Sequence, residues 1–200
     1  MSEIKEQVQN FIHKYLDVSP EAEAVIADYA LQTWRPLPNL VKYLQFIGDY
    51  STGRTRAGAV MAAICRNAFK TSVNASSSSL VAIIDERGAC VPIFDETDSM
   101  NDEVSVILKV GSMKDQKIIK MMEHEGKYVP VSFDVFGYKV ILSRKPFRDV
   151  ALEARCITVK MTGTDRNDIP RVLNGDFEKD SAEIQQALSA FYVGVPALAL

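Results

Sequence analysis

The sequence predicts an α/β fold of three layers, in which helices cover both faces of a mainly parallel β-sheet. Strand-type apolar runs alternate with helix-type segments along most of the 200 residues, an order typical of parallel strands joined by crossover helices. A glycine-containing loop at residues 48–55 lies between a strand-type run at residues 41–47 and a helix-type segment at residues 56–69. In such a fold, ligands bind at the carboxyl ends of the strands.

The composition bounds the class of protein. With 47% hydrophobic and 24% charged residues, the chain resembles one soluble domain with a substantial core. A net charge of −3 gives no overall basic field for nucleic acid, so a DNA contact would need a local basic cluster. No apolar run approaches the roughly 20 residues of a membrane-spanning helix, so we expect no membrane partner.

The cysteines and histidines argue against a zinc site. The three cysteines show no CxxC spacing, and neither histidine has a cysteine or a second histidine nearby at ligand spacing. Isolated cysteines in predicted helices and strands are typical of buried, reduced thiols. The chain is therefore expected to be cytoplasmic.

Two helices are predicted before the loop. Apolar residues recur at helical spacing in residues 2–16. Ser19 followed by Pro20 marks the start of a second helix, because serine is a common N-cap and proline suits the first turn. That helix ends near Trp34, whose ring could stack on adenine or serve only in packing.

The loop at residues 48–55 reads Gly-Asp-Tyr-Ser-Thr-Gly-Arg-Thr and matches the P-loop pattern GxxxxGK[ST] except at one position. Its backbone N–H groups and the positive end of the following helix would hold phosphate, and a threonine hydroxyl would bind Mg²⁺. A plain turn is the alternative interpretation. We expect the nucleotide to be bound by Gly48, Ser51, Thr52, Gly53, Arg54 and Thr55, with Thr55 also a metal ligand.

Arg54 is the departure from the pattern. The usual lysine is a compact, mobile charge, whereas a guanidinium is wider, planar and forked. Arg54 keeps the charge and changes the geometry, and a misplacement of about 1 Å can cost about a hundredfold in rate. Reduced hydrolysis is expected, and two hypotheses follow: a working ATPase, or a degenerate P-loop module that serves assembly or regulation.

An acid pair follows the apolar run at residues 89–94. Asp95 would hold Mg²⁺, usually through water, and Glu96 would orient or deprotonate the attacking water. An exposed acidic turn is the alternative, although the position about forty residues after the loop favours the metal site. Pro92 is irregular for an inner strand, because proline favours edges or bulges.

The remaining segments continue the alternation. Lys114, Lys117 and Lys120 recur every third residue of a segment at 111–123 and would share one helix face, which is either solvated or in contact with a nucleic-acid backbone. An apolar tail at residues 193–200 indicates a cut within a longer protein or an oligomer contact. The other predicted elements are a strand at 70–74, a serine-capped helix at 80–87, a helix at 101–110 capped by Asn101, strands at 128–133 and 139–142 joined by a turn at 136–137, a strand at 156–161 and a helix at 181–192.

These motifs resemble P-loop ATPases of the AAA+ type, and within them the ATPase domains of phage, plasmid and archaeal primase-helicase-like proteins. The resemblance covers residues 4–162 and rests on YLQFIG before the loop, IFDETD at the acid pair and the late segment YKVILSRKPFRDVALEARCITVKM. It implies that Ser143 occupies the γ-phosphate sensor position, although asparagine or threonine is commoner there and a structural serine is the alternative.

The same resemblance implies that Arg155 is an arginine finger that reaches the nucleotide of a neighbouring subunit. A pairing of Arg155 with Glu153 or Asp149 on a solvated loop is the alternative, and Arg144 and Arg148 compete for the role.

The resemblance implies ATP and Mg²⁺ as ligands, DNA unwinding or remodelling in mobile-element replication, and a homo-oligomer such as a ring. It also implies a division into an N-terminal helical appendage at residues 1–38, a P-loop core at residues 39–162, and a partial lid or truncated extension at residues 163–200.

Overall fold

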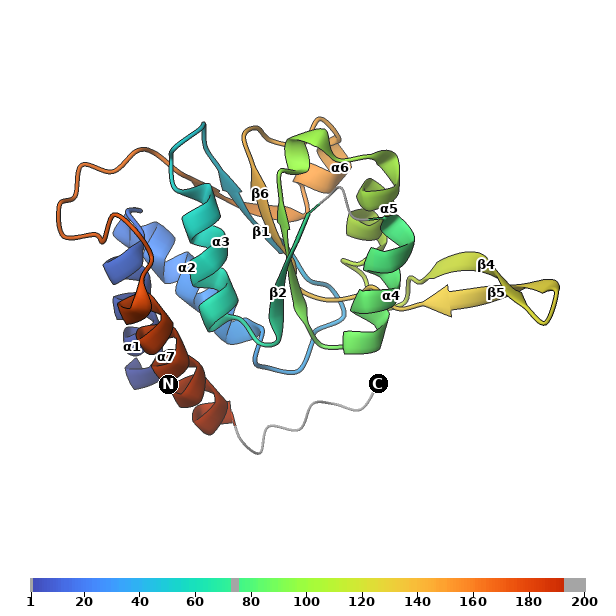
Figure 1. Ribbon diagram of the computed structural model, residues 1–200, viewed down its shortest axis with the longest axis horizontal. Helices are drawn as coiled ribbons and strands as arrows, with labels where there is room; N and C mark the ends of the chain where they lie inside the picture. Colours follow the sequence, from blue (N-terminus) through green and yellow to red (C-terminus); the bar gives the residue numbers. More distant parts are fainter. Residues whose placement is uncertain (1, 73–75, 193–200) are drawn as a thin grey trace.

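The computed structural model describes residues 2–72 and 76–192, so the predictions for residues 73–75 and 193–200 lie outside the described residues. Helices and strands alternate along much of the chain (Figure 1). In chain order they are α1 (Ser2–Tyr15), α2 (Pro20–Gln32), β1 (Tyr43–Ile47), α3 (Arg54–Ile64), β2 (Ala68–Ser72), α4 (Ser77–Arg87), β3 (Val91–Asp95), the 3₁₀ turn η1 (Thr97–Ser99), α5 (Asp102–Val110), β4 (Ile118–His124), β5 (Lys127–Phe133), β6 (Val140–Ser143), α6 (Val150–Glu153), β7 (Cys156–Lys160) and α7 (Gly175–Tyr192).

The five-stranded sheet confirms the predicted parallel arrangement. Its strand order is β2-β3-β6-β1-β7, and every neighbouring pair is parallel. Ile47 at the end of β1 pairs with Ser143 of β6 on one side and with Lys160 of β7 on the other. The carboxyl ends of the strands therefore meet at one edge, where the loop after Ile47 begins.

Helices cover both faces of this sheet, which confirms the predicted three layers. Helices α1, α2, α3 and α7 gather on one side, and α4, α5 and α6 on the other (Figure 1). The central strands β1 and β6 are almost wholly buried, as expected for parallel strands covered on both faces. The helix starts were also predictable, because Ser19 and Asn101 cap α2 and α5 by accepting backbone N–H bonds.

A polar chain crosses the three strands β6, β1 and β7. The buried Gln45 donates from Nε2 to the Ser143 hydroxyl over 3.2 Å, and the Thr158 hydroxyl donates to Gln45 Oε1 over 3.2 Å. Because buried polar groups need partners, these bonds satisfy Gln45 within the core. They also fix the strand end from which the loop departs.

The expectation of a lysine-bearing helix at residues 111–123 is wrong. Residues 118–124 form β4, which pairs antiparallel with β5 in a separate hairpin that projects from the body of the molecule (Figure 1). The signal was a two-residue turn, Glu125-Gly126, in which both residues have positive φ, at 51° and 77°. Such a turn suits the twist of a hairpin. The strand at 128–133 exists as predicted, but its partner is β4 and not residues 139–142.

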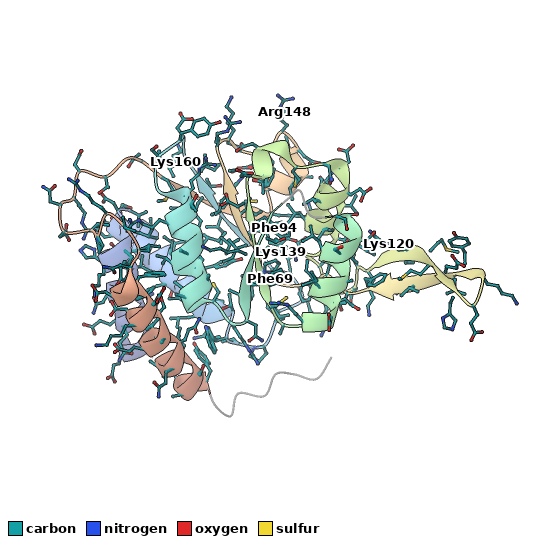
Figure 2. All side chains as sticks on the ribbon, in the orientation of Figure 1. Phe69, Phe94, Lys120, Lys139, Arg148 and Lys160 are labelled. Atoms are coloured by element: carbon teal, nitrogen blue, oxygen red, sulfur yellow. The ribbon has the colours of Figure 1, made fainter. Side chains whose placement is uncertain are left out.

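The lysines of that segment do not share a helix face. Lys120 lies on β4, and its Nζ donates to the hydroxyls of Ser77 and Ser78 over 3.2 Å and 2.9 Å. Figure 2 shows Lys120 beside the helices at the base of the hairpin. Lys120 thus anchors the hairpin to α4.

Two irregular residues of the sequence have packing explanations. Pro92 lies in an inner strand, but the ladder from β3 to β6 begins at Ile93, after the proline. The Trp34 Nε1 atom donates to the Ile64 carbonyl oxygen over 2.8 Å, and its ring stacks on Tyr192 with centroids 6.1 Å apart. Trp34 therefore packs against α3 and α7.

Candidate phosphate-binding site

The loop between β1 and α3 turns tightly at the carboxyl edge of the sheet. A Cβ atom at Gly48 would lie 2.4 Å from Thr52 Oγ1 and 2.7 Å from the Met161 carbonyl oxygen, so only glycine fits there. Ser51 and Gly53 both adopt left-handed backbone conformations, with φ of 62° and 91°. These two positions bend the chain into the first turn of α3.

The start of α3 offers backbone donors to an anion. The first helical hydrogen bond runs from the Ala57 N–H to the Gly53 carbonyl oxygen over 2.9 Å. The N–H groups of Arg54, Thr55 and Arg56 thus precede the first turn-closing bond of the helix. Gly53, at the N-cap position, has no side chain that could cap them. A phosphate group would suit this end, where the helix dipole is positive.

The acid pair lies at the same edge, at the end of β3. The half-buried Asp95 accepts a bond from the Glu96 N–H over 2.8 Å. Glu96 is exposed and has a φ of 58°, a left-handed conformation that costs a residue with a side chain of order 1 kcal/mol. Next to it, the Thr97 hydroxyl donates to the Leu142 carbonyl oxygen over 3.0 Å. Thr97 thus ties the turn after the acid pair to β6.

Ser143 lies between the loop and the acid pair. Its side chain is 1% exposed and accepts the bond from Gln45, while its carbonyl oxygen accepts the Gly48 N–H over 3.2 Å. The sheet register thus brings the predicted sensor residue against the loop. The hydroxyl itself is engaged with the interior of the sheet.

Arg155 lies at the opposite edge of the sheet. It precedes Cys156, which pairs with Tyr43 at the amino end of β1. Its Nε donates to the Ser112 hydroxyl over 3.0 Å, and its Nη1 donates to the Ala151 carbonyl oxygen. The structure therefore does not bring Arg155 to the loop of its own chain, and its bonds go to Ser112 and Ala151 and not to Glu153 or Asp149, the alternative partners.

A charged cluster that the sequence analysis missed surrounds Asp98 in the turn after β3. Arg54 Nη1 lies 3.7 Å from Asp98 Oδ2, and Arg144 Nε lies 3.3 Å from the same oxygen. Arg144 Nη1 also donates to the Tyr50 hydroxyl over 2.8 Å, with the guanidinium 5.1 Å from the centre of that ring. The only sequence signal was that IFDETD contains a third acid. The cluster joins the P-loop arginine to the ends of β3 and β6.

A cavity of about 490 Å³ adjoins the loop, which is within the range typical of small-ligand sites. Arg56 lines it; its Nη2 donates to the Arg171 carbonyl oxygen over 2.8 Å, and its Nη1 is buried without a hydrogen-bond partner in the described part of the chain. A buried donor of this kind favours a ligand with an acceptor atom. Besides Arg56, the walls come from Tyr15 to Asp17, from Ser51 to Gly53, and from the segment after β7 that includes Met161, Arg166 and Arg171.

No protein-family model matches the sequence, and no curated protein sequence matches it either. Solved structures do resemble the chain. An inhibitor-bound JCV helicase matches with a TM-score of 0.51 and 13% identity, over 98% of this chain and 62% of that one. A P216G mutant of Thermotoga maritima RuvB matches with a TM-score of 0.50 and 16% identity, over 74% of this chain and 48% of that one.

At such identities the likeness concerns the fold. The chain has the P-loop NTPase fold. It spans about half to two thirds of the length of these two structures. Among the helices of the described ranges, none is both long enough and apolar enough to cross a bilayer.

Proposed function

We propose that this P-loop domain binds ATP and Mg²⁺ as an AAA+-type module and couples ATP hydrolysis to DNA unwinding or remodelling in phage or plasmid replication. One observation carries the nucleotide part: the tight loop from Gly48 to the start of α3 shares an edge of the sheet with Asp95. The DNA part has weaker support, from the family resemblance and from the helicase-like fold.

The phosphates would be held mainly by the backbone. In this proposal the N–H groups of Ser51 and Gly53 and those of the first turn of α3 cradle the phosphate oxygens. Gly48 and Thr52 shape the loop around the phosphates, because their N–H groups donate to the Ser143 and Asp49 carbonyl oxygens. Arg54 adds a positive charge beside them. Because amides supply much of the binding, the Lys-to-Arg change should weaken hydrolysis more than affinity.

The donor set at this edge suits magnesium. A threonine hydroxyl at Thr55 and a carboxylate at Asp95 are the hard oxygen ligands that Mg²⁺ prefers. When bound, the ion would neutralise charge on the phosphate oxygens. Glu96 is the residue proposed to orient or deprotonate the attacking water, with Ser143 as the γ-phosphate sensor.

The nucleoside would occupy the cavity beside the loop. Its volume of about 490 Å³ and its position next to Ser51 and Gly53 support this assignment. The unpartnered Arg56 Nη1 would donate to a base or ribose acceptor.

Arg155 is proposed to act at a subunit interface, and the β4–β5 hairpin is proposed to contact DNA. Arg155 would act across a subunit interface of a homo-oligomer such as a ring, which agrees with its distance from the loop of its own chain. The hairpin exposes Tyr128 at 70% and Ile119 at 69%, and exposed aromatic rings can stack on single-stranded bases.

The alternative, a degenerate P-loop module for assembly or regulation, also has an observation in its favour. The Arg54 guanidinium already has a counter-ion in Asp98. An arginine engaged in this way is less available to phosphates than a free lysine.

The test is binding of a fluorescent ATP analogue with Mg²⁺, together with ATP hydrolysis with and without single-stranded DNA. We expect binding, DNA-stimulated hydrolysis, and loss of turnover with retained binding in Glu96→Gln. The neighbouring exposed acid Glu103 provides a matched control, because Glu103→Gln should keep turnover. If the parent neither binds nor hydrolyses ATP while Arg54→Lys restores binding, the scaffold interpretation replaces the ATPase.

A further inference from the structure

The two arginines around Asp98 are held differently. Arg144 is attached through its backbone N–H, which lies 2.9 Å and 3.0 Å from the two Asp98 carboxylate oxygens, and through its Nε at 3.3 Å. Arg54 makes a single ion-pair contact with Asp98, at 3.7 Å. Bonds to a backbone N–H fix a carboxylate more firmly than one long ion pair does. Asp98 is thus fixed to the end of β6 and holds Arg54 loosely.

We propose that Asp98 is a positioning residue that competes with phosphate for Arg54: it holds the guanidinium beside the loop and releases it to an entering polyphosphate. This inference rests on the proposed nucleotide-binding function and specifies how that site is regulated. The exchangeable contact with Asp98 depends on an arginine at position 54, because a lysine side chain is shorter and its charged group has a different geometry.

The charges of the cluster make the exchange feasible. Arg54 and Arg144 carry two positive charges against the single negative charge of Asp98, so their contacts with Asp98 leave positive charge that can attract an anion. The negative charges of Asp95 and Glu96 at the same edge would be offset by the Mg²⁺ of the proposed site. When Arg54 leaves, Asp98 keeps its bonds to Arg144, so the carboxylate is not left without a partner. The side chains of Arg54 and Asp98 are 15% and 20% exposed, so solvent screens their attraction only in part.

The competition also predicts which ligands are selected. A polyphosphate brings several negative charges to Arg54 and can displace one carboxylate. A monophosphate brings at most two negative charges, so it competes less well with the Asp98 carboxylate for Arg54. We therefore expect neutralisation of Asp98 to tighten binding chiefly for ligands whose β- and γ-phosphates reach Arg54, and to change AMP binding little.

The experiment is a double-mutant cycle of Asp98→Asn and Arg54→Gln, read as the Kd of ATP with Mg²⁺. Asparagine keeps an oxygen for the Arg144 N–H and removes the charge. We expect Asp98→Asn to bind ATP about three- to tenfold more tightly, as for loss of a partly exposed ion pair. In the Arg54→Gln background, the same substitution should have no effect. Asp102→Asn, an equal change of charge in the first turn of α5, should change the Kd less than about twofold.

The outcomes separate this inference from the proposed function. An equal gain in both backgrounds would mean that Asp98 merely repels phosphate, and the inference would be wrong while ATP binding stands. Unchanged or weaker ATP binding by Asp98→Asn would also overturn the inference that Asp98 competes with phosphate. If neither the parent nor any of these variants binds ATP or inorganic pyrophosphate, both proposals fall.

A second measurement needs no change at Asp98. The side-chain Nε–H resonances of Arg54 and Arg144, assigned with Arg54→Lys and Arg144→Lys, can be followed by NMR while inorganic pyrophosphate and Mg²⁺ are added to the parent chain. The Arg54 resonance should shift in step with binding, and that of Arg144 should shift little because it keeps its carboxylate. A stationary Arg54 resonance in the presence of bound pyrophosphate contradicts the exchange.

Discussion

Two basic side chains near opposite ends of the sheet show how differently this fold uses such groups. Arg54, at the carboxyl edge, is partly exposed and has one loose ion pair with Asp98 at 3.7 Å. Lys139, just before β6 at the amino edge, is fully buried, and its Nζ donates to the carbonyl oxygens of Val135, Gly137 and Gly111 over 2.7 Å, 3.0 Å and 3.4 Å. Figure 2 shows Lys139 enclosed in the interior.

The difference separates an exchangeable charge at Arg54 from a structural, hydrogen-bonded amine at Lys139. The carbonyls around Lys139 belong to the two ends of the excursion that carries the hairpin, so this lysine fastens the base of the hairpin to the core. The contact of Arg54 is a single ion pair at 3.7 Å, which in our proposal is released to a ligand. The carboxyl edge is therefore suited to binding, and the amino edge to holding the fold.

Arg155 gives the strongest test of this difference between the two edges, because it lies at the amino edge and is nevertheless proposed to act in catalysis. We expect Arg155→Ala to lower ATP hydrolysis about a thousandfold with unchanged ATP affinity, as for loss of an arginine finger. Steady-state hydrolysis and analogue binding measure the two effects. Mixing Arg155→Ala with Glu96→Gln subunits should restore part of the rate, because some interfaces then pair both intact residues.

Arg148 is the matched control for Arg155. It is exposed and lies at the periphery of the molecule (Figure 2). If Arg148→Ala abolishes hydrolysis while Arg155→Ala leaves it intact, the finger is Arg148, and the amino edge is purely structural.

Gly48 tests how far binding at the carboxyl edge depends on the shape of the loop. Gly48→Ala places a Cβ atom 2.4 Å from Thr52 Oγ1 and 2.7 Å from a backbone carbonyl oxygen, so the loop must move. We expect about a hundredfold weaker binding of the ATP analogue, because the backbone amides lose their alignment. Gly175→Ala, at the start of α7 and outside the cavity, is the control, since its Cβ meets no described atom within 4 Å. Equal affinities for the two variants would exclude Gly48 from the binding site.

How far the sequence predicted these features depends on whether the signal is local. The turn at Gly48 and the caps at Ser19 and Asn101 depend on neighbouring residues and were predictable. The pairing of Arg54 with Asp98 joins the start of α3 after β1 to the turn η1 after β3. No local sequence pattern encodes the strand order that brings these two segments together. The proposed division at residues 38 and 162 stays a prediction.

The hairpin shows how a local sequence pattern can predict the wrong secondary structure. Three lysines at three-residue spacing suggested a helix face, whereas Glu125-Gly126 indicated a hairpin turn. The turn decided the structure because β4 and β5 pair over their full length around it. Helical spacing in so short a segment is weak evidence, because Ile118, Met121 and Met122 also recur at helical spacing and nevertheless lie in β4.

Lys139 gives a test of the amino edge through pH. Burial lowers the pKa of Lys139 from 10.5 to about 7, so between these values the unfolded chain binds more protons than the folded one. The free energy of unfolding should therefore rise with pH from 7 to 9, by at most about 1.4 kcal/mol per pH unit. Above pH 9 the opposite effect sets in, because burial raises the pKa of Cys65 to about 12.

The measurement for Lys139 is urea unfolding of the parent and of Lys139→Met at pH 7, 8 and 9. The rise should be present in the parent and absent from the variant, since methionine does not titrate. Identical slopes in the two proteins would mean that the three carbonyls keep the amine protonated across this range, and that Lys139 is a charged clamp.

The smallest expected effect concerns the exposed face of the hairpin, beyond the base at which Ile118 and Phe133 pack against the core. Tyr128→Ala removes a ring that is 70% exposed, so stability should change by less than about 0.5 kcal/mol. If the ring stacks on single-stranded bases, affinity for a labelled oligonucleotide should fall about fivefold to tenfold, and DNA stimulation of hydrolysis should fall with it. Tyr50→Phe keeps the ring at the carboxyl edge and should leave DNA affinity unchanged. A parent chain that binds DNA equally well without the Tyr128 ring would move the DNA surface away from the hairpin and leave that element to protein contacts alone.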